Sequence, residues 1–153
     1  MKKYFYTTVA LFAFAIAMPV NAATDTMQTT EVQNAFASWR TALSGQDPQK
    51  IVDLYDKEAI LLATLAEKPI KSQEDRLVYF KGLTANPNLA AKVDEEYVRV
   101  LDDNTALVSG VYTFSFDKDG KATEIPARYT FVYEKMGDKW MIVEHHSSMV
   151  PKQ

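Results

Sequence analysis

Apolar residues recur at helical spacing in three segments of the first half of the chain. The first helix is predicted to begin at Thr30, where Gln33 three positions later completes a capping box. Its apolar positions define one buried face, formed by Val32, Ala35, Phe36, Trp39 and Leu43. Two shorter helices are predicted to start at Asp47-Pro48 and at Ser72, because these residues are typical of helix N-termini. The pattern therefore predicts three helices before the main run of strands.

Alternation of apolar and polar residues replaces the helical pattern from Lys92 onward. Polar turns divide this region into three predicted strands, at 93–101, 105–116 and 121–136. A fourth strand begins at Trp140 and is joined to the third by Met-Gly-Asp, a typical hairpin turn. One more short strand is predicted at 59–65, between the helices. Helices followed by a four- or five-strand antiparallel meander indicate an α+β domain, with the helices packed on one face of a curved sheet.

The N-terminal residues predict export of the protein. Two lysines precede an apolar segment, residues 9–18, that is too short to span a membrane, and small residues at 20 and 22 suit a cleavage site. An uncleaved membrane anchor is the alternative. We expect a periplasmic or secreted protein with three parts: a signal peptide at 1–22, a flexible segment at 23–29 and a single domain at 30–151.

The overall composition is ordinary for a globular domain. Hydrophobic residues make up 47% of the chain and charged residues 24%. The formal net charge is −3 and no basic block is present, which argues against a nucleic acid partner. The chain has no cysteine, so it can form neither a disulfide nor a lipid anchor at cysteine. We therefore expect no membrane partner after signal cleavage.

The last predicted strand carries both histidines of the chain, in the run His-His-Ser-Ser at 145–148. Strand side chains alternate between faces, so His145 and Ser147 share one face with Met141 and Val143. An imidazole and a hydroxyl between apolar walls suit a small polar binding site. The same residues also suit a strand end that is exposed to solvent.

Several segments together resemble a known family: Leu54-Tyr55, Ala59–Thr64, Tyr79-Phe80, Gly110–Phe114, Ala127–Tyr133 and His145–Ser148. They are similar to bacterial proteins related to the calcium/calmodulin-dependent kinase II association domain, in the nuclear transport factor 2-like superfamily. More narrowly, they resemble the iota class of carbonic anhydrases. The resemblance implies a cone-shaped α+β fold. Val150 and Ala63 stand where the family usually has Met and Pro, changes that we expect to affect packing more than chemistry.

The resemblance implies an enzyme that reversibly hydrates carbon dioxide to bicarbonate. Matching the family position by position places its anion site on Thr64, Tyr79, His145 and Ser147. Tyr112, on the strand face assigned to the pocket, is predicted to form a wall of it. We hypothesise that neutral His145 accepts a proton from the attacking water. Ser147 and Thr64 would then hold the carbon dioxide oxygen, with Tyr79 as a further donor or proton relay. On pattern alone, Thr64 also suits an ordinary strand residue and Tyr79 a packed tyrosine with a solvated hydroxyl.

We predict a mechanism without a metal or other cofactor. His145 and His146 are adjacent on a strand and point to opposite faces, so they cannot bind the same ion. Glu144 shares a face with His146, but the two lack a third neighbouring ligand. A zinc or manganese ion remains an alternative, because members of the class have been linked to both metals.

Two other functions remain open from the sequence. One is a non-catalytic small-ligand-binding or oligomerisation module. Under this function or the enzymatic one, we expect a homodimer through an outer sheet face that carries Val132, Trp140 and Ile142. The other is an isomerase or epoxide hydrolase of the same superfamily. Those enzymes need a buried carboxylate base, and no Asp or Glu falls on the predicted inner strand face.

Overall fold

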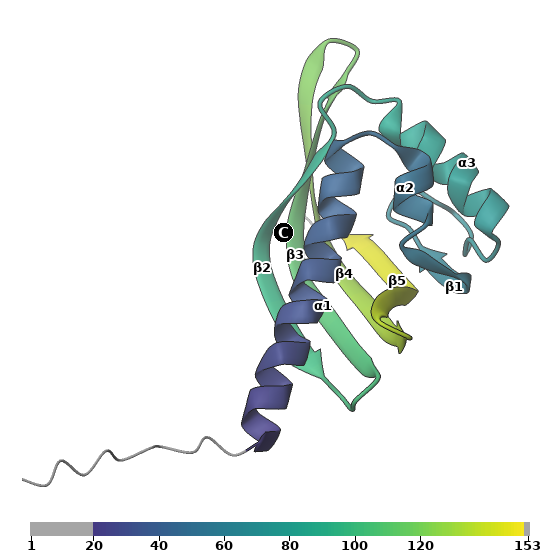
Figure 1. The fold of residues 1–153 in the computed structure, drawn as a ribbon. Helices are drawn as coiled ribbons and strands as arrows, with labels where there is room; N and C mark the ends of the chain where they lie inside the picture. The colour runs from purple at the N-terminus through teal and green to yellow at the C-terminus, as the bar shows by residue number, and fades with distance from the viewer. Residues whose placement is uncertain (1–19, 152–153) are drawn as a thin grey trace, which may run out of the picture.

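The computed structural model describes the backbone of residues 20–151 and side chains from residue 25. The predicted signal peptide, residues 1–22, lies almost entirely outside the described residues. The elements follow in the order α1 (Val20–Ser44), α2 (Pro48–Val52), β1 (Tyr55–Leu62), α3 (Gln73–Thr84), β2 (Ala90–Val100), β3 (Thr105–Lys118), β4 (Lys121–Met136) and β5 (Lys139–Met149). Figure 1 shows α1 lying across the sheet and α2 and α3 beside β1. The predicted α+β class, with helices on a curved sheet, is confirmed.

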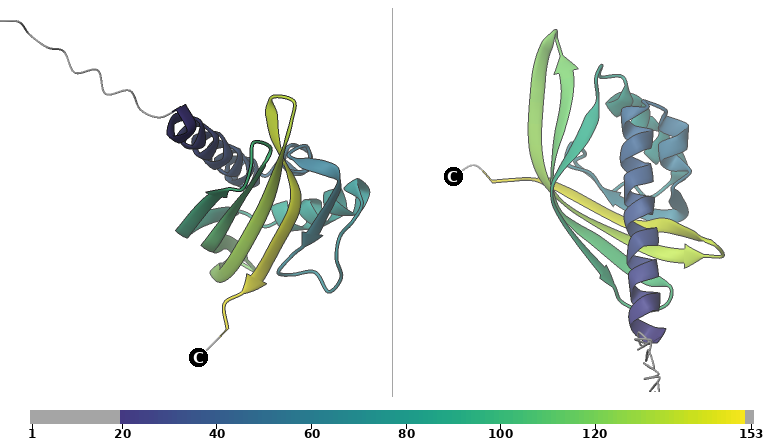
Figure 2. Two further views of the ribbon diagram at one scale, coloured as in Figure 1. Left: turned by 90° about the horizontal axis from the view of Figure 1, so that it is seen from below. Right: turned by 60° about the vertical axis from the view of Figure 1, so that its left-hand side comes forward.

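The five strands form one sheet in the order β1-β5-β4-β3-β2. Strands β2 to β5 are the predicted antiparallel meander, and Figure 2 shows how strongly they curve beside α1. Strand β1 differs from the prediction, because it pairs parallel with β5, with Leu61 opposite His145. A meander assumes that neighbours in sequence pair, whereas α3 and three strands separate β1 from its partner. This pairing brings the residues after β1 next to the end of β5.

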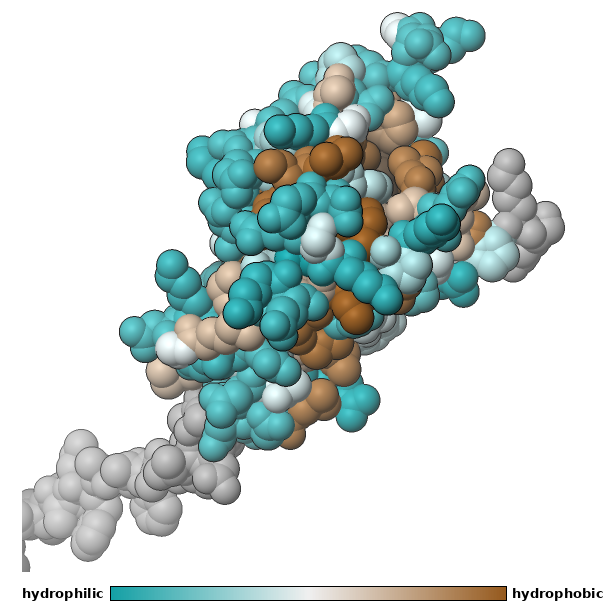
Figure 3. Space-filling model, turned by 90° about the vertical axis from the view of Figure 1, so that its right-hand side faces the viewer, coloured by the Kyte–Doolittle hydropathy of each residue, from teal (hydrophilic) through white to brown (hydrophobic). Residues whose placement is uncertain are grey.

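Apolar side chains also reach the surface on the side formed by α3 and β1. Leu62, Leu65 and Val78 are exposed there, with Val78 70% accessible. Figure 3 shows brown apolar side chains on this side of the molecule, separated by hydrophilic ones. The surface is therefore mixed in character and does not form one continuous apolar patch.

Helix α1 begins at Val20, ten residues before the predicted start at Thr30. Residues 23–29, expected to be flexible, are therefore helical. The predicted capping box is wrong: the Thr30 hydroxyl donates to the Thr26 carbonyl within the helix, and the Gln33 amide donates to Glu96 on β2.

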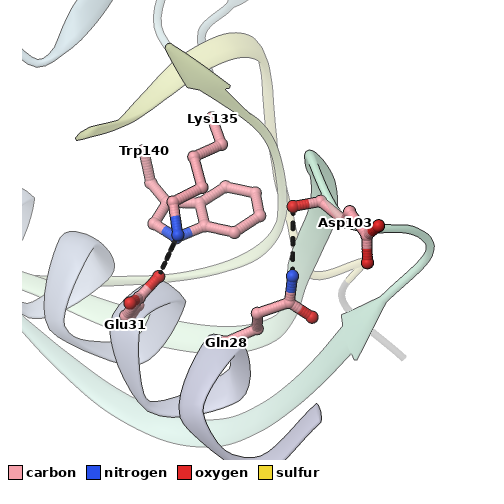
Figure 4. Close-up of polar contacts among 5 residues, drawn as sticks. All are labelled: Gln28, Glu31, Asp103, Lys135 and Trp140. Atoms are coloured by element: carbon pink, nitrogen blue, oxygen red, sulfur yellow. Dashed lines mark hydrogen bonds and ion pairs between the residues drawn. The ribbon is translucent and has the colours of Figure 1, made fainter. Parts of the chain in front are cut away.

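Contacts with the strand ends hold the early part of α1 in place, as Figure 4 shows. Gln28 donates to the Asp103 carbonyl in the turn between β2 and β3, at 3.0 Å. One carboxylate oxygen of Glu31 accepts from Lys135 at 2.8 Å and from the Trp140 indole at 2.9 Å. Because these partners lie about 75 or more positions away in sequence, a local pattern could not predict them.

A β-bulge in β5 changes which residues face the core. Tyr133 pairs with Ile142 and the preceding residue on β4, Val132, pairs with Glu144, so Val143 is the extra residue. Trp140 and Ile142 are consequently buried, although they were predicted to lie on the outer face. The bulge then reverses the alternation, so His145 and Ser147 face inward as well. The predicted sharing of a face between His145 and Ser147 is confirmed, but Met141 and Val143 do not share it.

A second bulge bends the sheet at β2. The register between β2 and β3 shifts between Val93 and Glu95, opposite Tyr112 and Val111, and Gly110 follows as the partner of Glu96. The Glu95 carbonyl approaches so closely that a Cβ atom on Gly110 would lie 1.9 Å from its oxygen. The Tyr129 hydroxyl donates to the same carbonyl at 3.1 Å. The absence of a side chain at position 110 therefore permits the bend in this part of the sheet.

Candidate functional site

A small cavity lies between α3, the end of β1 and the concave face of the sheet. Its volume is about 10 Å³, which suits a molecule of roughly the size of water. All five residues singled out in the sequence line it, together with six mainly apolar neighbours: Trp39, Leu61, Ala63, Thr64, Tyr79, Phe80, Leu83, Tyr112, Phe114, His145 and Ser147. The structure thus brings together side chains from five separate segments.

Three hydroxyls form a hydrogen-bonded group at one wall of this cavity. The Tyr112 hydroxyl donates to Ser147 Oγ at 2.7 Å, and Ser147 Oγ lies 2.5 Å from Thr64 Oγ1. Burial raises the pKa of Tyr112 well above its usual value, so this phenol stays protonated. Three hydroxyl protons serve two hydrogen bonds, which leaves one proton of the Ser147–Thr64 pair free for a ligand.

His145 is buried at the same cavity, with 3% of its surface accessible. Its ring stacks on Phe131 with 3.8 Å between centroids, and its Nδ1 lies 2.8 Å from the Tyr55 hydroxyl. Burial lowers the pKa of His145 to about 3, with a smaller contribution from His146 in the same direction. The imidazole is therefore neutral at pH 7, as expected, but it is a much weaker base than a solvated histidine. Nε2 is buried and has no hydrogen-bond partner within residues 25–151.

Tyr79, on α3, is a further tyrosine in the lining of the cavity. Its ring packs edge-on against Phe80, with centroids 5.2 Å apart. Burial raises the pKa of Tyr79 to about 12, so the hydroxyl keeps its proton at neutral pH. No side chain or carbonyl in the described part of the chain accepts that proton, which leaves Tyr79 as another donor for a ligand.

A second chamber of about 10 Å³ adjoins the first. The two share Thr64, Tyr79, Leu83 and Phe114 in their walls. The other walls of the second chamber are wholly apolar, from Leu65, Phe116 and Ile125. A polar chamber and a more apolar one therefore adjoin, and Thr64 and Tyr79 are the polar residues that both contain.

Arg76 contacts the β1 backbone next to the site and was not singled out in the sequence. It is 1% exposed and lies on the inner side of α3, four residues before Phe80. The guanidinium donates to the carbonyls of Ala59, Asp56 and Lys57. These carbonyls lie where β1 departs from regular pairing with β5, between Tyr55 and Ile60. The helical spacing of Arg76 from Phe80 was the one signal in the sequence that pointed to its burial.

Neither chamber is lined by an acidic residue, which agrees with the inner strand face predicted from the sequence. In the described part of the chain, no three His, Cys, Asp or Glu side chains are grouped so that they could hold a metal ion. No helix in residues 20–151 has both the length and the apolar character needed to span a membrane.

Comparison with solved structures defines the class of protein first. A dehydratase of the NTF2-like family from Streptomyces avermitilis superposes with a TM-score of 0.73 at 17% identity, covering 85% of this chain and 99% of that one. The hub homology domain of CaMKII type from Chlamydamonas reinhardtii gives a TM-score of 0.70 at 22% identity, over 81% of this chain and 99% of that one. The fold is therefore that of the NTF2-like proteins.

Sequence similarity then gives the family. The profile of the calcium/calmodulin dependent protein kinase II association domain matches residues 28–151. A structure described as such an association domain, from Xanthomonas campestris, is 40% identical, with a TM-score of 0.76 over 80% of this chain and 88% of that one. The chain belongs to the calcium/calmodulin dependent protein kinase II association domain family. No curated protein sequence matches it.

Proposed function

We propose that this protein catalyses the reversible hydration of carbon dioxide to bicarbonate at the two chambers. The observation that carries the proposal is the set of donors around a cavity of about 10 Å³: one proton of the Ser147–Thr64 pair, the Tyr79 hydroxyl and the buried imidazole of His145. Such a cavity is too small for the bulky substrates of most enzymes. The two adjoining chambers together suit a reactant of only a few atoms, and the donors suit oxygens that gain negative charge.

The apolar chamber supports the same assignment. Carbon dioxide is uncharged and has no net dipole, so the walls formed by Leu65, Phe116 and Ile125 suit it. Bicarbonate is an anion and favours the hydroxyl-lined chamber. In this proposal, Thr64 and Tyr79, which line both chambers, lie where apolar carbon dioxide is converted to anionic bicarbonate.

In the proposed reaction, the oxygen of water bonds to the carbon of carbon dioxide. One C=O electron pair moves to oxygen, where the donors stabilise the new negative charge, each by roughly 3 kcal/mol. The proton released by water passes along the Ser147–Thr64 pair, one oxygen accepting while the other releases, and reaches solvent because Thr64 is partly exposed. With its pKa lowered to about 3, His145 suits the hypothesised role of proton acceptor poorly.

Stopped-flow measurement of carbon dioxide hydration tests the proposal. We expect turnover by chelator-treated protein, with zinc and manganese added back in parallel samples. Ser147→Ala should lower the rate by about 100-fold, because it removes the centre of the hydroxyl group. Ser148→Ala is the matched control, since Ser148 lies on the other face of β5 beside Arg128. Equal losses in the two variants, or no turnover by the wild type under any of the three conditions, would contradict the proposal.

Self-association is a second candidate function, compatible with the first. It is supported by membership of an association domain family and by similarity to a hub homology domain. The outer face of the sheet offers a surface in three cross-strand rows: Leu107–Val132–Glu144, Ser109–Thr130–His146 and Val111–Arg128–Ser148. With Trp140 and Ile142 in the core, this face is less apolar than predicted.

Sedimentation velocity tests whether that face mediates assembly. We expect a dimer or larger oligomer for the wild type and a shift toward monomer for Val132→Glu, which places a charge in the first row. A monomeric wild type at micromolar concentration, or an unchanged assembly in the variant, would reject this face.

A further inference from the structure

The hydroxyl of Tyr55 links the protein core to the imidazole of His145. The Trp39 indole N–H donates to the Tyr55 oxygen at 3.0 Å, and the same oxygen lies 2.8 Å from His145 Nδ1. An indole nitrogen can only donate, so the Tyr55 oxygen is an acceptor in the first contact. Tyr55 is 4% exposed, and burial raises its pKa well above the usual value, so its proton is retained and is buried.

The proton of the Tyr55 hydroxyl has an acceptor in only one of the two neutral tautomers of His145. If Nδ1 is unprotonated, Tyr55 donates to it, and the single polar group left unpaired is the N–H at Nε2. If Nδ1 carries the proton, it must donate to the Tyr55 oxygen. The Tyr55 proton then has no acceptor within residues 25–151, and the Nε2 lone pair is unpaired as well. Leaving a second buried polar group unpaired disfavours this form by about tenfold or more.

Nε2 is the ring nitrogen of His145 that is left to bind a ligand in the cavity, because Nδ1 is already paired with Tyr55. Tyr55, which occupies Nδ1, is not among the residues that line either chamber, whereas His145 lines the polar one. Nε2 is also the buried side-chain nitrogen at the site for which the protein supplies no partner. A ligand in the cavity would therefore meet an N–H group at this wall.

We propose that Trp39 and Tyr55 are positioning residues that hold His145 as the Nε2–H tautomer, so that the imidazole donates a hydrogen bond to an anion in the cavity. The inference deepens the proposed function and depends on it only for the choice of bicarbonate as the anion. It assigns His145 the role of donor, beside Tyr79 and the Ser147–Thr64 pair, in place of the hypothesised role of base.

Nitrogen-15 NMR of the full domain reads the tautomer without turnover. In protein labelled at histidine, long-range proton–nitrogen spectra distinguish a protonated from an unprotonated ring nitrogen. The chain has two histidines, and His146→Gln identifies the exposed one. We expect His145 to show a protonated Nε2 and an unprotonated Nδ1. We also expect sodium bicarbonate, but not sodium chloride at equal ionic strength, to shift the Nε2–H resonance.

Tyr55→Phe tests the origin of the preference. Without the Tyr55 hydroxyl, neither nitrogen of His145 has a hydrogen-bond partner, so neither tautomer is favoured by such a contact. The fraction of molecules with the proton on Nε2 should therefore fall from about nine-tenths or more toward one-half. The apparent dissociation constant for bicarbonate should then rise by about twofold, in proportion to the lost fraction. Tyr133→Phe is the matched control, because Tyr133 is also buried near Phe131 but its hydroxyl has no partner in the described residues. The control should leave the His145 spectrum unchanged.

The outcomes separate the inference from the proposed function. A wild-type spectrum with a protonated Nδ1, or the same tautomer fraction in Tyr55→Phe as in wild type, would overturn the inference while leaving carbon dioxide hydration possible. The wild-type measurement alone decides the tautomer if Tyr55→Phe does not fold. The expected tautomer and bicarbonate shift in a protein that hydrates no carbon dioxide would support the inference and reject the proposed turnover.

Discussion

Replacing Arg76 by methionine should strongly destabilise the protein, because one side chain satisfies three carbonyls of β1. The variant keeps an unbranched apolar stem but removes all three bonds. A hydrogen bond from a charged group contributes roughly 1.5–3 kcal/mol, whereas burying the guanidinium costs several kcal/mol. We expect a net loss of about 3 kcal/mol. Typical domains have only about 5–15 kcal/mol of stability, so this is a large share.

Urea unfolding followed by circular dichroism measures this loss as a lower midpoint with an unchanged slope. Lys81→Met is the matched control, because Lys81 lies on the same helix with its side chain exposed. It should change stability by less than about 0.5 kcal/mol. If Arg76→Met were as stable as Lys81→Met, the carbonyls at positions 56, 57 and 59 would not need Arg76, and our account of this segment would be wrong.

Two further predictions concern the titration of His145 and the close contact between Gly110 and the Glu95 carbonyl. The pKa of His145 falls from 6.5 to about 3 on folding, so its contribution to stability is fully present above pH 6.5 and is lost as the pH falls toward 3. The free energy of unfolding, measured with urea, should therefore fall by about 2 kcal/mol more between pH 7 and pH 5 in wild type than in His145→Gln, with His146→Gln as the control at the exposed neighbour. Gly110→Ala should destabilise the fold by at least about 3 kcal/mol because of the Glu95 carbonyl, but Gly82→Ala, with open space around its Cβ, should stabilise α3 by roughly 0.5–1 kcal/mol. Thermal unfolding checks this prediction: the melting temperature should fall in Gly110→Ala and rise in Gly82→Ala.

The element types could be predicted from the sequence because they depend on local patterns. Strand β4 has the predicted bounds, 121–136, and α3 begins with the predicted cap, in which the Ser72 hydroxyl accepts from the Asp75 amide. Two predictions failed where the decisive partners are distant in the chain. The early part of α1 is held by a turn that contacts Gln28 and by strand ends that contact Glu31, and β1 pairs with the last strand instead of a neighbour in sequence.

The site could be predicted only in part, for a related reason. Alternation along the strands placed His145 and Ser147 together and put Tyr112 on the pocket face, and the family resemblance added Thr64 and Tyr79; all five line the cavity. The polar contacts of Trp39 and Tyr55 with this site were missed. Trp39 and Tyr55 appear in the sequence as ordinary apolar positions, and their polar atoms acquire meaning only through contacts across 16 and 90 positions.

The bulge at Val143 decides which chemistry faces the cavity. Trp140 and Ile142 face the core, so unbroken alternation would continue inward through Glu144 and His146. That arrangement would place the carboxylate of Glu144 and the imidazole of His146 in the cavity and turn His145 outward. The extra residue reverses the alternation, and neutral donors line the cavity in place of a carboxylate. A carboxylate there would repel an anion and would supply the kind of base that an isomerase uses, so the bulge itself favours an oxyanion over a substrate that must lose a proton.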